Sequence, residues 1–131
     1  MSLSLEWRHR IMAWRQELTQ HFIQPLGMIA LEAAFTKDQY QAADALTSLA
    51  FNPILPGDTW GAKWEYGWFR SALTLPTAAS GQMIALMMDV GGEAAVYVDG
   101  EYAGAFDKEH KYILITDAGQ PGRSYDILLE A

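Results

Sequence analysis

The fold is decided by one stretch in the second half of the chain, Gly91-Gly92-Glu93-Ala94-Ala95-Val96-Tyr97-Val98-Asp99-Gly100. Residues 94–98 alternate in character, which is typical of a half-buried β-strand. Asp99-Gly100 then suits a type I′ turn, because both central positions of that turn need positive φ. Residues 101–105 return along the first strand, so we predict a β-hairpin here, entered through a bulge or tight turn at Gly91-Gly92.

Further short strands are predicted on both sides of this hairpin. Residues 68–75 form one, which Pro76 ends. Residues 83–90 are almost wholly apolar and predict a strand buried on both faces. Two more strands, 112–116 and 125–129, are separated by a Gly-Gln-Pro-Gly turn. Five or six short strands at hairpin spacing indicate a mainly-β protein, a jelly-roll or galactose-binding-like β-sandwich.

The first third of the chain has a different pattern. Residues 4–23 carry apolar side chains at spacings of three and four, which predicts an N-terminal helix that ends before Pro25 and Gly27. Residues 28–35 form either a strand or a buried loop, residues 38–50 contain a short helix, and residues 52–61 form a loop. We therefore expect an N-terminal helix over 1–27 and a β-sandwich module over 28–131, within a single domain that is a fragment of a longer multidomain enzyme.

Composition excludes several classes of function. The 131 residues include no Cys, so a disulfide scaffold, a thiolate metal site and a Cys nucleophile are excluded, and a reducing cytoplasm is the expected compartment. Net charge is −7 with only nine basic residues, which is too small a basic footprint for nucleic acid. No apolar run reaches the length of a membrane span, and the N-terminus lacks the pattern of a signal peptide.

Complete catalytic constellations are also absent from the sequence. The three His residues, His9, His21 and His110, lack the spacing of a metal site. No Gly-x-Ser-x-Gly elbow occurs, and Glu93, Asp99 and Asp107 are candidates for a glycosidase acid pair only by elimination. Of these, Asp99 is better explained as a turn residue. We therefore expect no catalytic residue and no metal ligand set in this chain.

Two polar or aromatic segments remain as candidate sites. Trp60, Trp64, Tyr66 and Trp68 crowd one segment, where flat rings either stack on a sugar or fill a core or a domain interface. The second segment is the polar loop Asp107-Lys108-Glu109-His110, which is either a functional acid–histidine pair or a solvated turn that Asp107 caps. The residue types alone favour the structural alternative in both segments.

The combination of these segments resembles a known family. The loop Pro56-Gly57-Asp58-Thr59-Trp60-Gly61 is followed by Trp68-Phe69-Arg70, then by the hairpin of residues 91–100 and an Asp-x-x-His loop at Asp107 to His110. In this order and spacing they resemble the N-terminal domain of glycoside hydrolase family 38 α-mannosidases of the cytosolic and bacterial type. The resemblance covers residues 54–131. Residues 24–53 match poorly, and the middle of the Asp107–His110 loop departs from the family pattern.

The resemblance implies a non-catalytic accessory domain. Such a module packs on the catalytic domain of the same enzyme and helps to shape the substrate entrance, while zinc or another divalent metal belongs to the catalytic domain. Contacts with substrate or with that domain are expected from Trp60, Arg70, Glu93, Asp107 and His110. Mannose-containing glycans and a homo-oligomer are further possible partners. The alternatives are a free-standing carbohydrate-binding module and a structural interaction domain.

Overall fold

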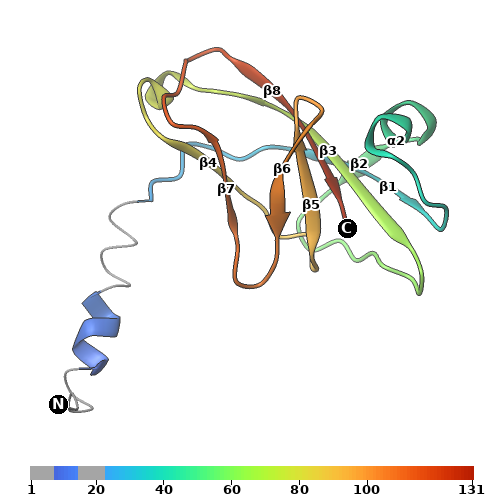
Figure 1. Cartoon of the computed structure of the whole chain (residues 1–131), viewed down its shortest axis with the longest axis horizontal. Helices are drawn as coiled ribbons and strands as arrows, with labels where there is room; N and C mark the ends of the chain where they lie inside the picture. Colours follow the sequence, from blue (N-terminus) through green and yellow to red (C-terminus); the bar gives the residue numbers. More distant parts are fainter. Residues whose placement is uncertain (1–7, 15–22) are drawn as a thin grey trace.

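The computed structural model describes residues 8–14 and 23–131 (Figure 1). Residues 8–14 are helical and exposed, so this part of the predicted N-terminal helix is confirmed. Residues 4–7 and 15–22 of that prediction lie outside the described residues, and Ile23, its last residue, is not helical.

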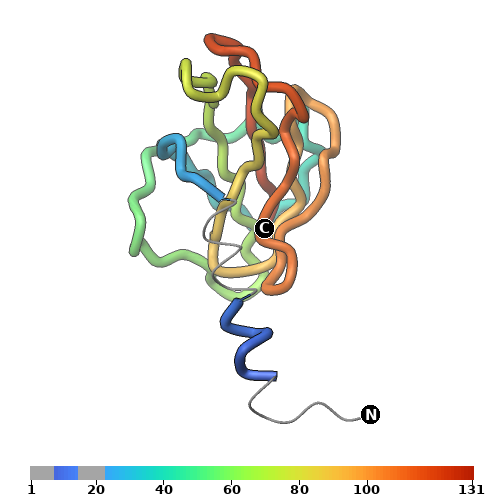
Figure 2. Tube along the Cα trace, turned by 90° about the vertical axis from the view of Figure 1, so that its left-hand side faces the viewer, coloured from blue at the N-terminus to red at the C-terminus, as the bar shows by residue number. Residues whose placement is uncertain are grey.

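The rest of the described chain is a sandwich of two antiparallel sheets that face each other (Figures 1 and 2). The larger sheet has the strand order β2-β1-β3-β8-β5-β6, and the smaller one pairs β4 with β7. The strands are β1 (Leu31–Thr36), β2 (Asn52–Ile54), β3 (Tyr66–Thr74), β4 (Ile84–Met87), β5 (Ala94–Val98), β6 (Glu101–Phe106), β7 (Tyr112–Thr116) and β8 (Ser124–Glu130). A short helix, α2 (Ala42–Ser48), and a 3-10 turn, η1 (Thr77–Ala79), lie in the connections. The predicted mainly-β jelly roll is therefore confirmed.

The main core lies between the two sheets. Phe69, Val96 and Leu129 point from the large sheet toward Ile84, Leu86 and Ile113 of the small one. Alternation along each strand produces this arrangement, because successive side chains point to opposite faces. Each fully buried side chain of this size contributes about 1.5–3 kcal/mol relative to an exposed one.

A second, smaller core lies on the other face of the large sheet. Trp68 and Leu128 are buried there beneath Ala45 of α2, and partly buried aromatic residues surround them. The Ala side chain at position 45 is small, which lets the helix lie close to the Trp68 ring. Within the described part of the chain, the Nε1 atom of Trp68 is buried without a hydrogen-bond partner. The predicted short helix within residues 38–50 is thus confirmed, and the structure shows that it covers Trp68.

The central hairpin follows the sequence closely. Asp99 and Gly100 have φ values of 50° and 82°, as the predicted turn requires. The Asp99 carboxylate also accepts a hydrogen bond from the backbone N–H of Asp126 at 2.8 Å, and this contact secures the turn to β8. Gly91 has a φ of 86°, and its N–H donates to the Asp89 carboxylate at 2.9 Å, so the predicted break there is a tight turn.

Two predictions need correction. Residues 52–61 are not wholly a loop, because Asn52–Ile54 pair with Leu31–Ala33 as β2. Residues 83–90 are not a strand buried on both faces: β4 spans only Ile84–Met87, and its side chains alternate between buried and exposed. The physical reason is that no described element covers the outer face of the two-stranded sheet, so its apolar residues Met83, Met87, Tyr112 and Leu114 stay exposed. The segment of residues 28–35, left open between a strand and a loop, forms β1 from Leu31 onward.

Candidate functional site

Three connections meet at one end of the sandwich, which we call the loop end: residues 55–65, 88–93 and 107–111. The register brings two of them together, because Ala94 pairs with Phe106 and so Glu93 and Asp107 leave the sheet side by side. Residues 55–65 join this end through a hydrogen bond between Trp60 and Val90. Figure 2 shows these segments at the same end of the molecule, close to the C-terminal residue.

Trp60 is held rigidly at the loop end. Its indole Nε1 donates a hydrogen bond of 2.8 Å to the backbone carbonyl of Val90. Its ring stacks on Phe35 at a centroid distance of 5.6 Å and meets Phe69 edge to face at 5.3 Å. Gly67 leaves room for the ring, since a Cβ atom there would lie 2.7 Å from the Trp60 ring carbon Cζ3. Trp60 therefore serves first as part of the core and forms a wall of the loop end.

A groove of about 1120 Å³ runs along this wall. Its floor is apolar, with Trp60 and Phe69, and its rim carries the carboxylates Asp58, Asp89 and Glu93. Two of these acids stabilise their own turns: Asp58 accepts from the N–H of Leu55 at 2.8 Å, and Asp89 accepts from Gly91. Glu93 has no such hydrogen bond within residues 23–131, so its carboxylate is free to contact another molecule.

Asp107 and His110 form a self-contained pair next to the groove. The Asp107 carboxylate accepts hydrogen bonds from the N–H groups of Glu109 and His110, each at 2.7 Å, and from His110 Nδ1 at 3.0 Å. The His110 side-chain bond, followed by the backbone N–H groups of His110 and Glu109, lowers the pKa of Asp107 below its ordinary value of 3.8. Asp107 thus caps the loop, while the His110 ring, with 74% of its side chain exposed, points outward.

Arg70 is not brought together with the other candidates. It lies on β3 but faces the α2 side of the large sheet, where it forms an ion pair of 2.6 Å with Glu32. Its guanidinium also lies 4.3 Å from the ring centroid of Phe51. Both partners of the ion pair are about two-fifths exposed, and such a pair contributes at most about 1 kcal/mol. The sequence therefore grouped Arg70 with residues that the fold places at the loop end, away from the α2 side of the sheet.

The crowded aromatic segment divides between core and surface. Trp68 is fully buried and Trp60 and Tyr66 are partly buried, as the structural alternative requires. Trp64 differs from these three, because 80% of its surface is exposed.

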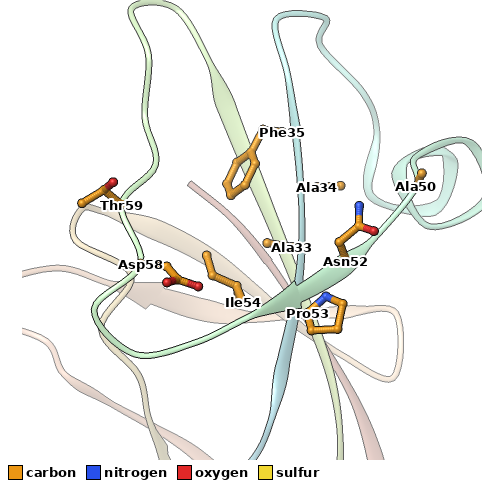
Figure 3. Close-up of a pocket in the computed structure, with 9 residues that line it drawn as sticks. All are labelled: Ala33, Ala34, Phe35, Ala50, Asn52, Pro53, Ile54, Asp58 and Thr59. Carbon is orange, nitrogen blue, oxygen red and sulfur yellow. The ribbon is translucent and has the colours of Figure 1, made fainter.

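A second hollow, which sequence reasoning missed, lies at the free edge of β1 (Figure 3). β2 pairs only with Leu31–Ala33, so the outer edge of β1 is open beyond that point. The hollow measures about 570 Å³. Its lining is Ala33, Ala34, Phe35, Ala50, Asn52, Pro53, Ile54, Asp58 and Thr59. No motif signalled it, because it arises where the chain passes from α2 into β2 and then continues to the loop of residues 55–65.

The described residues do not provide a metal site or a membrane span. No group of three or more His, Cys, Asp or Glu side chains within residues 8–14 and 23–131 has the geometry to hold an ion. In the same part of the chain, no helix is long and apolar enough to cross a bilayer.

The architecture defines a jelly-roll module, and comparison with known proteins places it. A family model described as "Alpha-mannosidase, jelly roll domain" matches residues 24–131. Human alpha-mannosidase 2C1 is 37% identical over 73 residues, which are 53% of this chain and 7% of that protein. The chain therefore belongs to the α-mannosidase jelly-roll domain family, and its resemblance to the N-terminal sandwich of family 38 enzymes is confirmed. The match extends to residue 24, so residues 24–53, which resembled the family poorly in sequence, belong to the same domain.

Solved structures support the fold alone. A β-glucuronidase from Ruminococcus gnavus, in complex with an N1-substituted uronic isofagomine, aligns with a TM-score of 0.51 and 15% identity. The alignment covers 82% of this chain and 21% of that one. The same enzyme bound to uronic deoxynojirimycin gives a TM-score of 0.52 and 14% identity, with the same coverage.

Proposed function

We propose that this chain is the non-catalytic N-terminal accessory domain of a cytoplasmic α-mannosidase. In this role it packs on the catalytic domain and helps to shape the substrate entrance. The divalent metal implied by the family is assigned to the catalytic domain. Membership of the family supports the proposal, as does the small share of a relative's length that the chain spans.

The observation that carries the proposal is the chemistry of the loop end. Glu93 has an uncommitted carboxylate, and the His110 ring is presented outward on a loop that Asp107 holds in shape. Loops at one end of a sandwich are where such folds place functional contacts, because the sheets hold them rigidly. A free acid and an exposed imidazole on a rigid end suit contact with a sugar or with the polar surface of a neighbouring domain.

Substitution of His110 tests this proposal. In the isolated chain, His110→Ala is expected to change the free energy of unfolding by less than about 0.5 kcal/mol, because the ring is exposed. In the full-length enzyme, the same change is expected to lower kcat/KM for an aryl α-mannoside or to loosen the domain contact. Lys111→Ala is the matched control, since Lys111 is an exposed neighbour in the same loop. Wild-type kinetics and an unchanged domain contact in the His110 variant would contradict the proposal.

Asp107→Ala separates the functional role from a structural one. The Asp107 carboxylate accepts hydrogen bonds from two backbone N–H groups and from the His110 ring within its loop, so its loss is expected to lower the melting temperature of the isolated chain more than the loss of His110 does. Reduced activity in Asp107→Ala alone, without an effect of His110→Ala, would assign the loop a purely structural role.

Two rival functions make different predictions. A free-standing carbohydrate-binding module would bind mannose-containing glycans as an isolated chain, which titration followed by Trp fluorescence detects. A structural interaction domain would bind neither glycan nor an α-mannosidase catalytic domain. We expect the isolated chain to give no saturable response to mannose below millimolar concentration, because Trp60 and Trp68 are occupied within the cores.

A further inference from the structure

Trp64 has a backbone conformation that its residue type rarely adopts. Its φ is 63°, in the left-handed region where a side chain other than Gly, Asn or Asp is strained. It is the third residue of a turn that Ala62 and Glu65 close, with Glu65 N–H donating to Ala62 O at 3.1 Å. A positive φ at this position is typical of a type II turn, where Gly or Asn is usual. The sequence therefore places an unfavourable residue where Gly would suit the backbone better.

Among the described residues, one other non-glycine residue, Asp99, has a positive φ, and its local contacts explain that conformation. Asp tolerates this conformation, and the Asp99 carboxylate accepts a hydrogen bond from Asp126. Trp64 has no equivalent compensation within residues 23–131. The ammonium of Lys63 lies 5.8 Å from its ring centroid, and the ring belongs to neither core cluster.

The solvent exposure of the Trp64 side chain is a second unfavourable feature of this residue. With 80% of its surface accessible, Trp64 leaves a large apolar ring in water in addition to its backbone strain. A residue that breaks two local rules without gain in its own domain is expected at a functional position. Trp is also, with Tyr and Arg, one of the residue types enriched among the few that dominate binding at protein interfaces.

The position of the turn indicates which partner it contacts. Gly67, three residues after Trp64, exchanges two backbone hydrogen bonds with Ala131, at 2.9 and 2.8 Å. A polypeptide that continues past Ala131 would therefore emerge beside this turn. Figure 1 shows the connection between β2 and β3 and the C-terminal residue on the same side of the molecule.

We propose that Trp64 is the anchor residue through which this module docks on the neighbouring domain of its own α-mannosidase. This inference rests on the proposed accessory function and adds the contact that carries it. The partner is expected to present an apolar pocket for the indole and a carboxylate for Lys63. A sugar platform is the less favoured alternative, because Lys63 approaches the ring and the Glu65 carboxylate already accepts from Ala62 N at 3.4 Å.

Amide hydrogen exchange tests the anchor by comparing this chain alone with the same residues inside the full-length enzyme. The expected result is protection of residues 61–67 in the enzyme, at least tenfold above the isolated chain, which Trp64→Gly removes. Lys63→Gly, in the same turn, is the control for loss of a side chain and is expected to keep most of the protection. In the isolated chain, Trp64→Gly is expected to leave the melting temperature unchanged or to raise it by about 3 °C, because Gly relieves the strain.

The possible failures are distinguishable. Protection of other surfaces of the module in the enzyme, but not of residues 61–67, would overturn the anchor and leave the accessory function intact. Equal protection in wild type and Trp64→Gly would overturn it as well. An absence of protection anywhere on the module would defeat the accessory function itself. Protection of the turn in the isolated chain by α-linked mannobiose would overturn docking in favour of the sugar platform.

Discussion

Gly67→Ala is expected to dislodge Trp60 and with it the wall of the loop end. Gly67 is buried on β3 and has no positive φ, so the backbone itself accepts Ala. The added methyl group would, however, clash with its surroundings, because a Cβ atom would lie 2.7 and 2.9 Å from the Trp60 ring carbons Cζ3 and Cη2. Carbon atoms pack favourably at about 3.5–4.0 Å, so the ring must move by roughly 1 Å.

The expected loss in the free energy of unfolding follows from the contacts that hold the Trp60 ring in place. A shift of that size removes the hydrogen bond from Trp60 Nε1 to Val90, which contributes about 1 kcal/mol. It also disturbs the contacts with Phe35 and Phe69, which contribute about 0.5–1.5 kcal/mol each. We therefore expect a loss of about 2–4 kcal/mol, which lowers the melting temperature of a domain of this size by roughly 10 °C.

Urea unfolding followed by far-ultraviolet circular dichroism measures the loss, and near-ultraviolet spectra report the displaced indole. Gly92→Ala is the matched control, because its Cβ would meet no atom within 4 Å and its φ is not in the left-handed region. That variant is expected to stay within about 0.5 kcal/mol of wild type or to gain slightly. A Gly67→Ala variant as stable as the control, with an unchanged near-ultraviolet spectrum, would refute the reasoning.

Three further outcomes are expected. Gly119→Ala should destabilise the chain by more than about 2 kcal/mol, measured by thermal melts, because its Cβ would overlap the backbone carbonyl of Ala79, which cannot rotate away. Because hydrogen bonds hold the pKa of Asp107 below 3.8, its stabilising contribution is present above that pH and is lost as the pH falls through the folded-state pKa. NMR titration of the carboxyl carbon should show this midpoint, and His110→Ala should raise it. The isolated chain should self-associate through the exposed outer face of β4 and β7, and Leu114→Lys should reduce its sedimentation coefficient at high concentration.

Local sequence was sufficient for the elements that local physics determines. The hairpin at Asp99-Gly100 was predictable because its turn needs positive φ at two adjacent residues. β2 was not, because three residues that include Pro53 carry no strand periodicity and pair only because β1 lies beside them. The alternation of buried and exposed side chains along β4 could not be predicted either, because a run of apolar residues does not show which face of a strand lacks a covering element.

The candidate site was predictable only where its residues are neighbours through local structure. Glu93 and Asp107 meet because they flank the two strands of one hairpin, a relation that the sequence shows. The bond between Trp60 and Val90 joins residues 30 positions apart, and the ion pair of Arg70 with Glu32 depends on the pairing of β1 with β3. Neither contact has a local signal. The strain at Trp64 is invisible in the sequence, because only the turn geometry makes its residue type unusual.

The place of β8 in the large sheet has a consequence for how the protein is made. This strand is the last in the sequence, yet it lies at the centre of the sheet, between β3 and β5. During synthesis, β2-β1-β3 and the hairpin of β5 and β6 must therefore wait as two unjoined halves with open edges until residues 124–130 have left the ribosome. Contacts between such distant segments form slowly, and open strand edges pair readily with other chains. The module is thus most vulnerable to aggregation during synthesis just before β8 is released, which is when a chaperone would be most useful to it.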